Sequence, residues 1–292
     1  MKVRFAVSAR IGSPDPADLD QLVTEAEAQG FDSLWFSDLP LLDATDPTLA
    51  VAFAAARSSR LKLGVNLVPF GYEPFVFARQ VAQLDHLTGG RLLVTLVPGL
   101  DQPGERAALG IGGAHRGRRI DALLPDLRMW WAGEAVAPAP EADPIALPLR
   151  PVQDPLEVWL GGSGPQAVER AGRLADGWLG SLTTGVDEVA ATRERIVQAA
   201  TDAGRVIDPE HFGLSIPYAR EDAELDEARR FRRPGGGDPS QHIPVGAAAL
   251  RSFIGRLTDA GLSKFVVRRV RQDGAWPDEL AWLADAVLDL QT

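Results

Sequence analysis

The chain has 292 residues, 45% of them hydrophobic, which is enough for a large core without disulfide or metal staples. It has no cysteine, which excludes disulfides, thiolate metal sites and cysteine nucleophiles. Its formal net charge of −10 argues against nucleic acid and anionic membrane surfaces as partners.

Hydropathy along the chain indicates neither a membrane span nor a signal peptide. No apolar stretch approaches the roughly 18 residues of a span. Near the N-terminus, Arg10 and the acids at 15, 18 and 20 interrupt any apolar signal region. We therefore expect a cytoplasmic location.

Short apolar runs alternate with helical patterns along the chain. The runs show no polar alternation, and the helical patterns place apolar residues on one face of a 3.6-residue period. Both features are typical of a parallel sheet covered by helices. The predicted strands are Val3 to Val7, Ser33 to Phe36, Leu61 to Leu67, Arg91 to Val97, Glu157 to Leu160, Gly177 to Gly180, Phe212 to Ile216 and Lys264 to Val267.

Eight such units in 292 residues match the size and count of a TIM barrel, so we predict a single α/β domain, a (β/α)8 barrel over residues 1–292. An open doubly wound sheet is the alternative, and the count of eight favours the barrel. Two insertions interrupt the repeat. A proline-rich crossing at 138–155 follows strand four, and a segment with three consecutive glycines at 232–244 follows strand seven.

The most informative segment covers residues 155–180, which contain an apolar run, the letters Gly-Gly-Ser-Gly-Pro, a helical pattern and a second apolar run. The first turn of a helix has unpaired N–H groups at the positive end of its dipole, so it stabilises a phosphate. Glycines also allow the backbone to approach a ligand closely. We predict a phosphate-binding turn, and the alternative is a tight turn with no ligand. The residues of this turn are Gly161, Gly162, Ser163 and Gly164.

The same turn partly fits a dinucleotide fingerprint, because residues 162–167 read G-x-G-x-x-A after a strand. That fold expects an acid at the end of the next strand, where it binds the ribose hydroxyls. Here Asp176 precedes the next strand, and the hydroxyls of Ser181, Thr183 and Thr184 follow it. The sequence therefore favours a phosphate over a nicotinamide dinucleotide.

Active sites of TIM barrels lie at the C-terminal ends of the strands. The residues predicted at these ends include no Ser-His-acid set and no metal-ligand spacing, so we predict no metal site and assign no catalytic residue. Of the four histidines, His115 is the one we place near the site. A pocket with an anion-binding turn and few acid-base groups suggests that a bound cofactor performs the chemistry.

Four segments carry a resemblance to the bacterial luciferase-like monooxygenase family. They occur in the family's order and span nearly the whole chain: GFDSLWFSD at 30–38, LDHLTGGR at 84–91, RGRRIDALLPDLRMWWAG at 116–133 and PVQDPLEVWLGGSGPQAVERAGRLADGWLG at 151–180. The family has a TIM barrel and uses FMN or the deazaflavin coenzyme F420. The overall pattern is closer to the branch of F420-dependent oxidoreductases.

The resemblance implies roles for residues at the ends of strands two to four. Asp38 matches the family's acid beside the flavin or deazaflavin ring. Asn66 and Leu67 match a strand-three bulge that often contains a non-proline cis peptide behind the ring. Gly99 is the glycine that ends strand four and belongs to the same expected cofactor site.

The resemblance also implies residues around the cofactor's phosphate. Gly161, Gly162 and Ser163 match the family's phosphate turn, and Thr183 lies where hydroxyls of the next strand meet the same group. Arg268 or Arg269 would add positive charge to that phosphate or reach the anionic tail of coenzyme F420.

Two positions depart from the sugar-phosphate dehydrogenases of this family. They have a histidine directly after the acid of strand two, where this chain has Leu39, and a glutamate after the glycine of strand four, where it has Leu100. Because both acid-base groups are missing, the sequence argues against that activity. With Leu41 and Leu42, these leucines either face a hydrophobic substrate or pack under a loop.

We therefore predict an oxidoreductase that transfers hydride between coenzyme F420 and a small organic substrate. One alternative is an FMN-dependent monooxygenase supplied with reduced flavin by a separate reductase. Another is a barrel that binds a flavin or another ligand without turnover. The family resemblance favours a homodimer.

Overall fold

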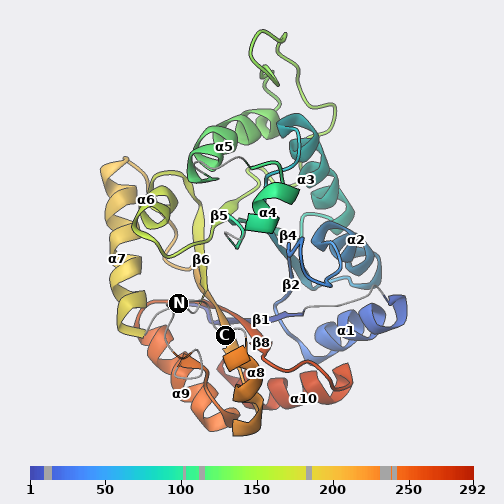
Figure 1. Cartoon of the computed structure of the whole chain (residues 1–292), viewed down its shortest axis with the longest axis vertical. Helices are drawn as coiled ribbons and strands as arrows, with labels where there is room; N and C mark the ends of the chain where they lie inside the picture. The colour runs from blue at the N-terminus through green and yellow to red at the C-terminus, as the bar shows by residue number, and fades with distance from the viewer. Residues whose placement is uncertain (10–14, 101–102, 112–115, 182–185, 231–237, 239–241) are drawn as a thin grey trace.

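The computed structural model describes residues 1–292 except 10–14, 101–102, 112–115, 182–185, 231–237 and 239–241. Its strands are all parallel and close into one barrel in sequence order, with β1 beside β8 (Figure 1). The predicted TIM barrel is confirmed. The strands are β1 (Arg4–Ser8), β2 (Ser33–Ser37), β3 (Lys62–Leu67), β4 (Leu92–Leu96), β5 (Val158–Leu160), β6 (Gly177–Ser181), β7 (Phe212–Tyr218) and β8 (Lys264–Arg269).

Helices surround the barrel, and several begin where the sequence places an N-terminal signal. The Asp46 side chain accepts from the N–H groups of Thr48 and Leu49, and proline occupies the first or second position of six described helices. Within the described residues, no helix is long and apolar enough to cross a bilayer. The helices are α1 (Pro16–Gln29), α2 (Pro47–Arg57), α3 (Pro74–Thr88), α4 (Pro103–Ala108), α5 (Arg116–Ala132), α6 (Pro165–Leu174), α7 (Val186–Asp202), η1 (Asp222–Glu224), α8 (Leu225–Arg230), α9 (Gly246–Asp259), α10 (Trp276–Val287) and η3 (Leu288–Leu290).

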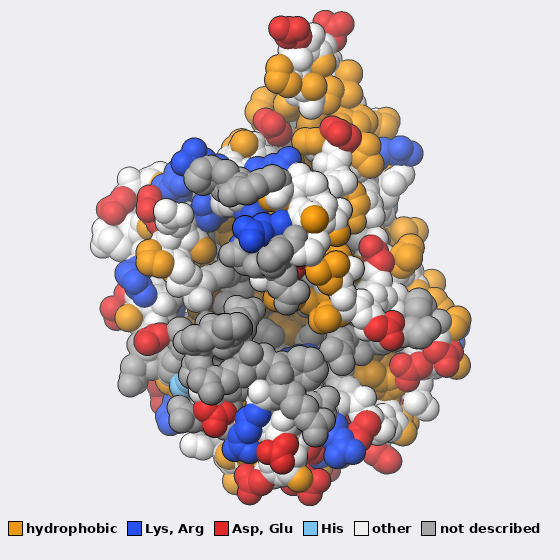
Figure 2. Space-filling view, in the orientation of Figure 1, with side chains coloured by type: hydrophobic (Ala, Val, Ile, Leu, Met, Phe, Trp, Pro, Cys, Tyr) orange, Lys and Arg blue, Asp and Glu red, His pale blue; other side chains and the backbone are white. Residues whose placement is uncertain are grey.

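Long segments follow β4 and β7, and they extend beyond the predicted ranges 138–155 and 232–244. The first contains α4, α5 and an arm that projects beyond α5 and carries apolar side chains (Figures 1 and 2). An isolated bridge between Val136 and Ile145 joins the two sides of this arm. Asp85 of α3 accepts hydrogen bonds from the N–H groups of Val152 and Gln153 at 2.7 and 2.9 Å, so it ties the returning chain to the barrel. The second contains η1, α8 and α9, and residues 232–237 and 239–241 of the predicted insertion lie outside the described residues.

Two tryptophans fill the middle of the barrel. Trp35 lies beside its register partner Gly64, and Trp159 lies beside its register partner Gly177. A Cβ atom at Gly64 would lie 2.1 Å from the Trp35 ring, and one at Gly177 would lie 2.5 Å from the Trp159 ring. Each glycine therefore leaves room for an indole ring on the neighbouring strand.

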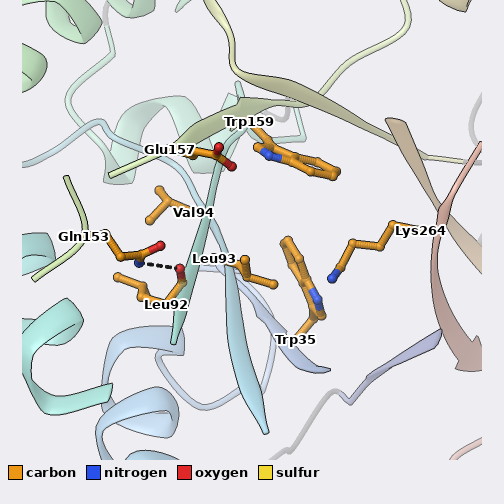
Figure 3. Close-up of a pocket in the computed structure, with 8 residues that line it drawn as sticks. All are labelled: Trp35, Leu92, Leu93, Val94, Gln153, Glu157, Trp159 and Lys264. Carbon is orange, nitrogen blue, oxygen red and sulfur yellow. Dashed lines mark hydrogen bonds between the residues drawn. The ribbon is translucent and has the colours of Figure 1, made fainter. Parts of the chain in front are cut away.

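The N-terminal end of the barrel contains a buried ion pair. Lys264 is only 4% exposed, and its Nζ lies 2.7 Å from the Asp32 carboxylate. A small cavity of about 20 Å³ lies beside this lysine and both tryptophans (Figure 3). Because Lys264 and Leu92 are the first residues of their strands, the cavity lies at the opposite end from Asp38. It has room for about one water molecule, so it is no cofactor site.

Candidate functional site

The predicted site residues lie where the parallel strands end, at the C-terminal mouth of the barrel. Thr183 lies outside the described residues, as do Arg10, His115 and Thr184. Those at this mouth that the structure describes are Asp38, Asn66, Leu67, Gly99, Gly161, Gly162, Ser163, Gly164 and Arg268.

Asp38 follows β2 directly, and two backbone contacts fix it at the mouth. Its own N–H donates to the Asn66 carbonyl at 2.9 Å, and its carboxylate accepts from the Val68 N–H at 3.2 Å. Burial raises the pKa of Asp38 to about 6, and the nearby carboxylates of Asp46 and Glu105 act in the same direction, while the Val68 N–H opposes them. A carboxyl group with this pKa can hold or release a proton near neutral pH.

The raised pKa predicts how Asp38 affects stability. The folded state binds more protons than the unfolded state between the ordinary pKa of 3.8 and the folded value of about 6. The free energy of unfolding therefore falls as pH rises through this window. Asp38→Asn should remove this fall and gain about 1 kcal/mol relative to wild type between pH 4 and pH 8, after allowance for solvent screening. Urea unfolding of both proteins across this range measures the difference, and parallel pH curves would contradict it.

Glu105 is a buried carboxylate at the mouth that sequence reasoning missed. This residue of α4 is 3% exposed, and both its oxygens accept from the Leu100 N–H, at 2.8 and 3.0 Å. Gly99 has a φ of +76°, and a Cβ there would lie 1.9 Å from Glu105 Oε1. Although Leu100 replaces the glutamate of the sugar-phosphate dehydrogenases, a carboxylate therefore still lies beside this turn. The available signal was an acid in the first turn of a helix just after the strand-four loop.

Two polar atoms inside the mouth lack partners. Asn66 and Thr95 are register partners on β3 and β4, and Asn66 Nδ2 donates to Ser37 Oγ at 2.9 Å. Within the described residues, Asn66 Oδ1 and Thr95 Oγ1 are buried without a hydrogen bond. Buried polar atoms are rarely left unpaired, because their desolvation is then not compensated. These two atoms therefore suit a ligand with polar groups.

The prediction of a cis peptide between Asn66 and Leu67 is wrong. In the described part of the chain, the cis bond is Asp154–Pro155. The Asn66 carbonyl accepts from Asp38 of the β2 side, and the Leu67 carbonyl accepts from Val97 of the β4 side, both at 2.9 Å. Regular extended backbone satisfies both ladders, so β3 continues without a bulge. The Leu67 side chain packs in the core between barrel and helices.

The turn after β5 has the backbone geometry of an anion cradle. Gly162 has a φ of +111°, which favours glycine, and its carbonyl accepts from Trp178 Nε1 at 2.9 Å. Gly164 is the N-cap of α6 and offers no side chain to the first-turn N–H groups. A Cβ at Gly161 would lie 2.8 Å from Val97, whereas one at Gly164 would meet no atom of the described residues within 4 Å. Among these residues, none fills the space directly before the helix.

Of the two candidate arginines on β8, the geometry favours Arg268. Arg269 forms ion pairs with the buried carboxylates of Glu224 and Glu279, and Tyr218 also donates to Glu279. Successive side chains of a strand point to opposite faces. Arg268 therefore shares the inner face of β8 with Val266, which packs against the interior tryptophans.

Apolar side chains line part of the rim. Leu41 and Leu42, in the loop after β2, are 46% and 42% exposed, and Leu39 and Leu100 are half-buried. Leu41 and Leu42 are therefore accessible at the mouth. Their contact with a hydrophobic substrate stays a prediction.

A comparison with known protein families gives a match over residues 1–276 to the model described as luciferase-like monooxygenase. The chain belongs to this family. The resemblance predicted from the four sequence segments is thereby confirmed.

Relatives of this luciferase-like protein include dehydrogenases and monooxygenases. It is 28% identical to the F420-dependent glucose-6-phosphate dehydrogenase of Nakamurella multipartita, over 90% of this chain and 86% of that protein. It is 27% identical to the limonene 1,2-monooxygenase of Rhodococcus erythropolis, over 83% of this chain and 66% of that one. An F420-dependent secondary alcohol dehydrogenase, solved with an F420-acetone adduct, has a TM-score of 0.83 at 17% identity, with 100% of both chains covered. That last likeness concerns the fold.

The mouth of the luciferase-like barrel fits a phosphate-bearing flavin or deazaflavin. The turn before α6 provides open backbone where a phosphate can approach. Asn66 Oδ1 and Thr95 Oγ1 provide polar atoms inside the barrel that no described residue pairs with. The residues would hold such a cofactor with its phosphate at the turn and its polar groups toward β3 and β4.

Proposed function

We propose that this luciferase-like protein is an oxidoreductase that binds coenzyme F420 at the C-terminal mouth and catalyses hydride exchange with a small organic substrate. The observation that carries the proposal combines the glycine turn at the N-terminus of α6 with two polar atoms of β3 and β4; among the described residues, the turn is open and these atoms are unpaired. F420-dependent enzymes among the relatives support this cofactor. When bound, the deazaflavin ring supplies the hydride donor or acceptor.

The chain's own residues would bind and orient the cofactor and shield it from water. The backbone of 161–164 would hold the phosphate, and Asn66 and Thr95 would receive polar groups of the cofactor. Asp38, whose pKa burial raises to about 6, can hold a proton on its carboxyl group at the rim. Leu39 and Leu100 provide apolar surface that excludes water.

The proposal predicts selective binding of coenzyme F420. We would titrate the purified, cofactor-free protein with coenzyme F420 and, separately, with FMN, following ligand fluorescence. We expect coenzyme F420 to bind more tightly. Selective binding of FMN would favour the FMN-dependent monooxygenase in place of this proposal. If neither cofactor binds, the barrel without turnover is favoured.

A second candidate is an FMN-dependent monooxygenase that receives reduced flavin from a separate reductase. The leucines at the rim favour it, because they offer a hydrophobic substrate contact but no acid-base group. Its signature would be oxygen consumption that requires reduced FMN and an apolar substrate.

A further inference from the structure

Three arginines lie in the first turn of α5, at Arg116, Arg118 and Arg119, and this turn contains no acid. We call these three residues the arginine rim. Positive side chains at a helix N-terminus are repelled by the positive end of the helix dipole. The rim therefore does not stabilise its own helix, and it concentrates positive charge in a chain whose formal net charge is −10.

Two contacts hold the rim at the mouth of the barrel. Arg116 Nη1 donates to the Pro98 carbonyl, just after β4, at 2.7 Å. The Arg119 guanidinium lies 5.8 Å from the ring centroid of Phe70, in the loop after β3. Figure 2 shows Lys and Arg side chains gathered on this face, where α4 and the start of α5 lie.

Arg118 is exposed, and its side chain makes no hydrogen bond or ion pair with any residue in the part of the chain that the structure describes. Helical side chains tilt toward the helix N-terminus, so those of the rim extend toward the mouth. The rim can therefore receive an anion without first breaking an internal ion pair of Arg118.

The rim lies close to the predicted phosphate turn. A Cβ at Gly117 would lie 2.1 Å from Arg170 Nη2 of α6, and Arg170 Nε donates to Asp121 of α5 at 2.8 Å. These contacts place the first turn of α5 against α6. Arg170 is five residues beyond Pro165, about 7.5 Å along the helix at about 1.5 Å per residue. A phosphate at the start of α6 would thus have the rim beside it.

We propose that the arginine rim binds the anionic γ-glutamyl tail of coenzyme F420, and that it thereby distinguishes this coenzyme from FMN. The inference rests on the proposed F420-dependent function. FMN ends at its phosphate, whereas coenzyme F420 continues through a phosphodiester into a chain of carboxylates. Guanidinium groups match carboxylates in charge and in hydrogen-bond geometry. The rim is where such a chain would run when the phosphate occupies the turn.

The test compares coenzyme F420 bearing a diglutamyl tail with the same coenzyme lacking its glutamates, by fluorescence titration at low salt. Wild type should bind the tailed form about tenfold more tightly, as expected for a few exposed charge pairs. The double variant Arg118→Gln/Arg119→Gln should bind both forms alike, with unchanged affinity for the tailless form. Raising the salt to 1 M should remove the wild-type preference, because the Debye length falls to about 3 Å.

The double variant Arg57→Gln/Arg60→Gln is the charge-matched control. Both arginines precede β3 at the opposite end of the barrel, with side chains 51% and 77% exposed, and this variant should keep the wild-type preference. Circular dichroism checks that both variants are folded. If wild type binds the two forms equally, or if the rim variant keeps the preference, the arginine rim does not bind the tail. In either case the proposed F420-dependent function still stands. If wild type binds neither form, the proposed function falls and the rim falls with it.

Discussion

Replacing Gly164 by valine should lower the affinity for coenzyme F420 by about 10- to 100-fold while the barrel stays folded. Gly164 has an ordinary φ of −68° and an ordinary extended ψ, and no atom of the described residues lies within 4 Å of a Cβ placed there, so this part of the structure accepts a side chain. A phosphate at the start of α6 would not, because valine would occupy its approach to the backbone N–H groups. Losing one or two charge-assisted hydrogen bonds accounts for a factor of this size.

Gly255→Val is the matched control for this substitution. Gly255 lies in α9, and a Cβ there also meets nothing within 4 Å. Gly162 is a poorer choice for the test, because its φ of +111° and a Cβ position 2.9 Å from Ala167 would strain the turn itself. Thermal unfolding and fluorescence titration of both variants separate folding from binding. Unchanged affinity of Gly164→Val for coenzyme F420 would show that the cofactor's phosphate does not bind at this turn.

Asp32→Asn should destabilise the protein by about 3 kcal/mol, because it removes the carboxylate partner of the buried Lys264. Breaking a buried ion pair on one side costs about 3–5 kcal/mol. Burial already lowers the pKa of Lys264, and the Asp32 charge acts against that lowering. In the variant, residue 32 carries no negative charge to offset the desolvation of the Lys264 ammonium group.

The pH dependence of this loss gives a second readout. A lysine whose pKa is lower in the folded state binds fewer protons there than in the unfolded state, so the free energy of unfolding rises with pH until the unfolded lysine also deprotonates near 10.4. The deficit of Asp32→Asn should therefore shrink between pH 7 and pH 9.5 in urea unfolding. Asp20→Asn is the control, because Asp20 pairs with Arg57 at the surface and should change stability by less than about 0.5 kcal/mol. A deficit below about 1 kcal/mol would contradict the prediction.

The fold could be predicted because each strand is a short apolar run between recognisable helix signals. These signals are ordinary ones, since the Asp46 side chain caps the start of α2, and left-handed glycines end α1 and α3. The ends of β7 and β8 were placed two residues short, because Pro217 and Arg268 are not apolar. They nevertheless pair with each other in the sheet. Pairing, unlike periodicity, depends on the neighbouring strand.

The candidate site could be predicted in part for a similar reason. Residues that follow strands closely, such as Asp38 and Gly99, reach the mouth whatever the details of packing. Glu105 could not be placed, because its carboxylate returns from a helix to the strand-four turn. The partners of Arg269 could not be placed either, since Glu224 and Glu279 come from two other elements of the fold. The cis peptide was taken from the family resemblance, and two ladder hydrogen bonds of β3 exclude the bulge it requires.

The paired tryptophans and glycines in the barrel also constrain how this chain can diverge. Because the Trp35 ring fills the space of a side chain at Gly64, a larger residue at one position is compatible only with a smaller residue at the other. The same reciprocity joins Trp159 to Gly177. Mutational paths through either position should therefore require compensating double changes, so the two members of each pair are expected to covary among relatives while neighbouring surface positions drift independently.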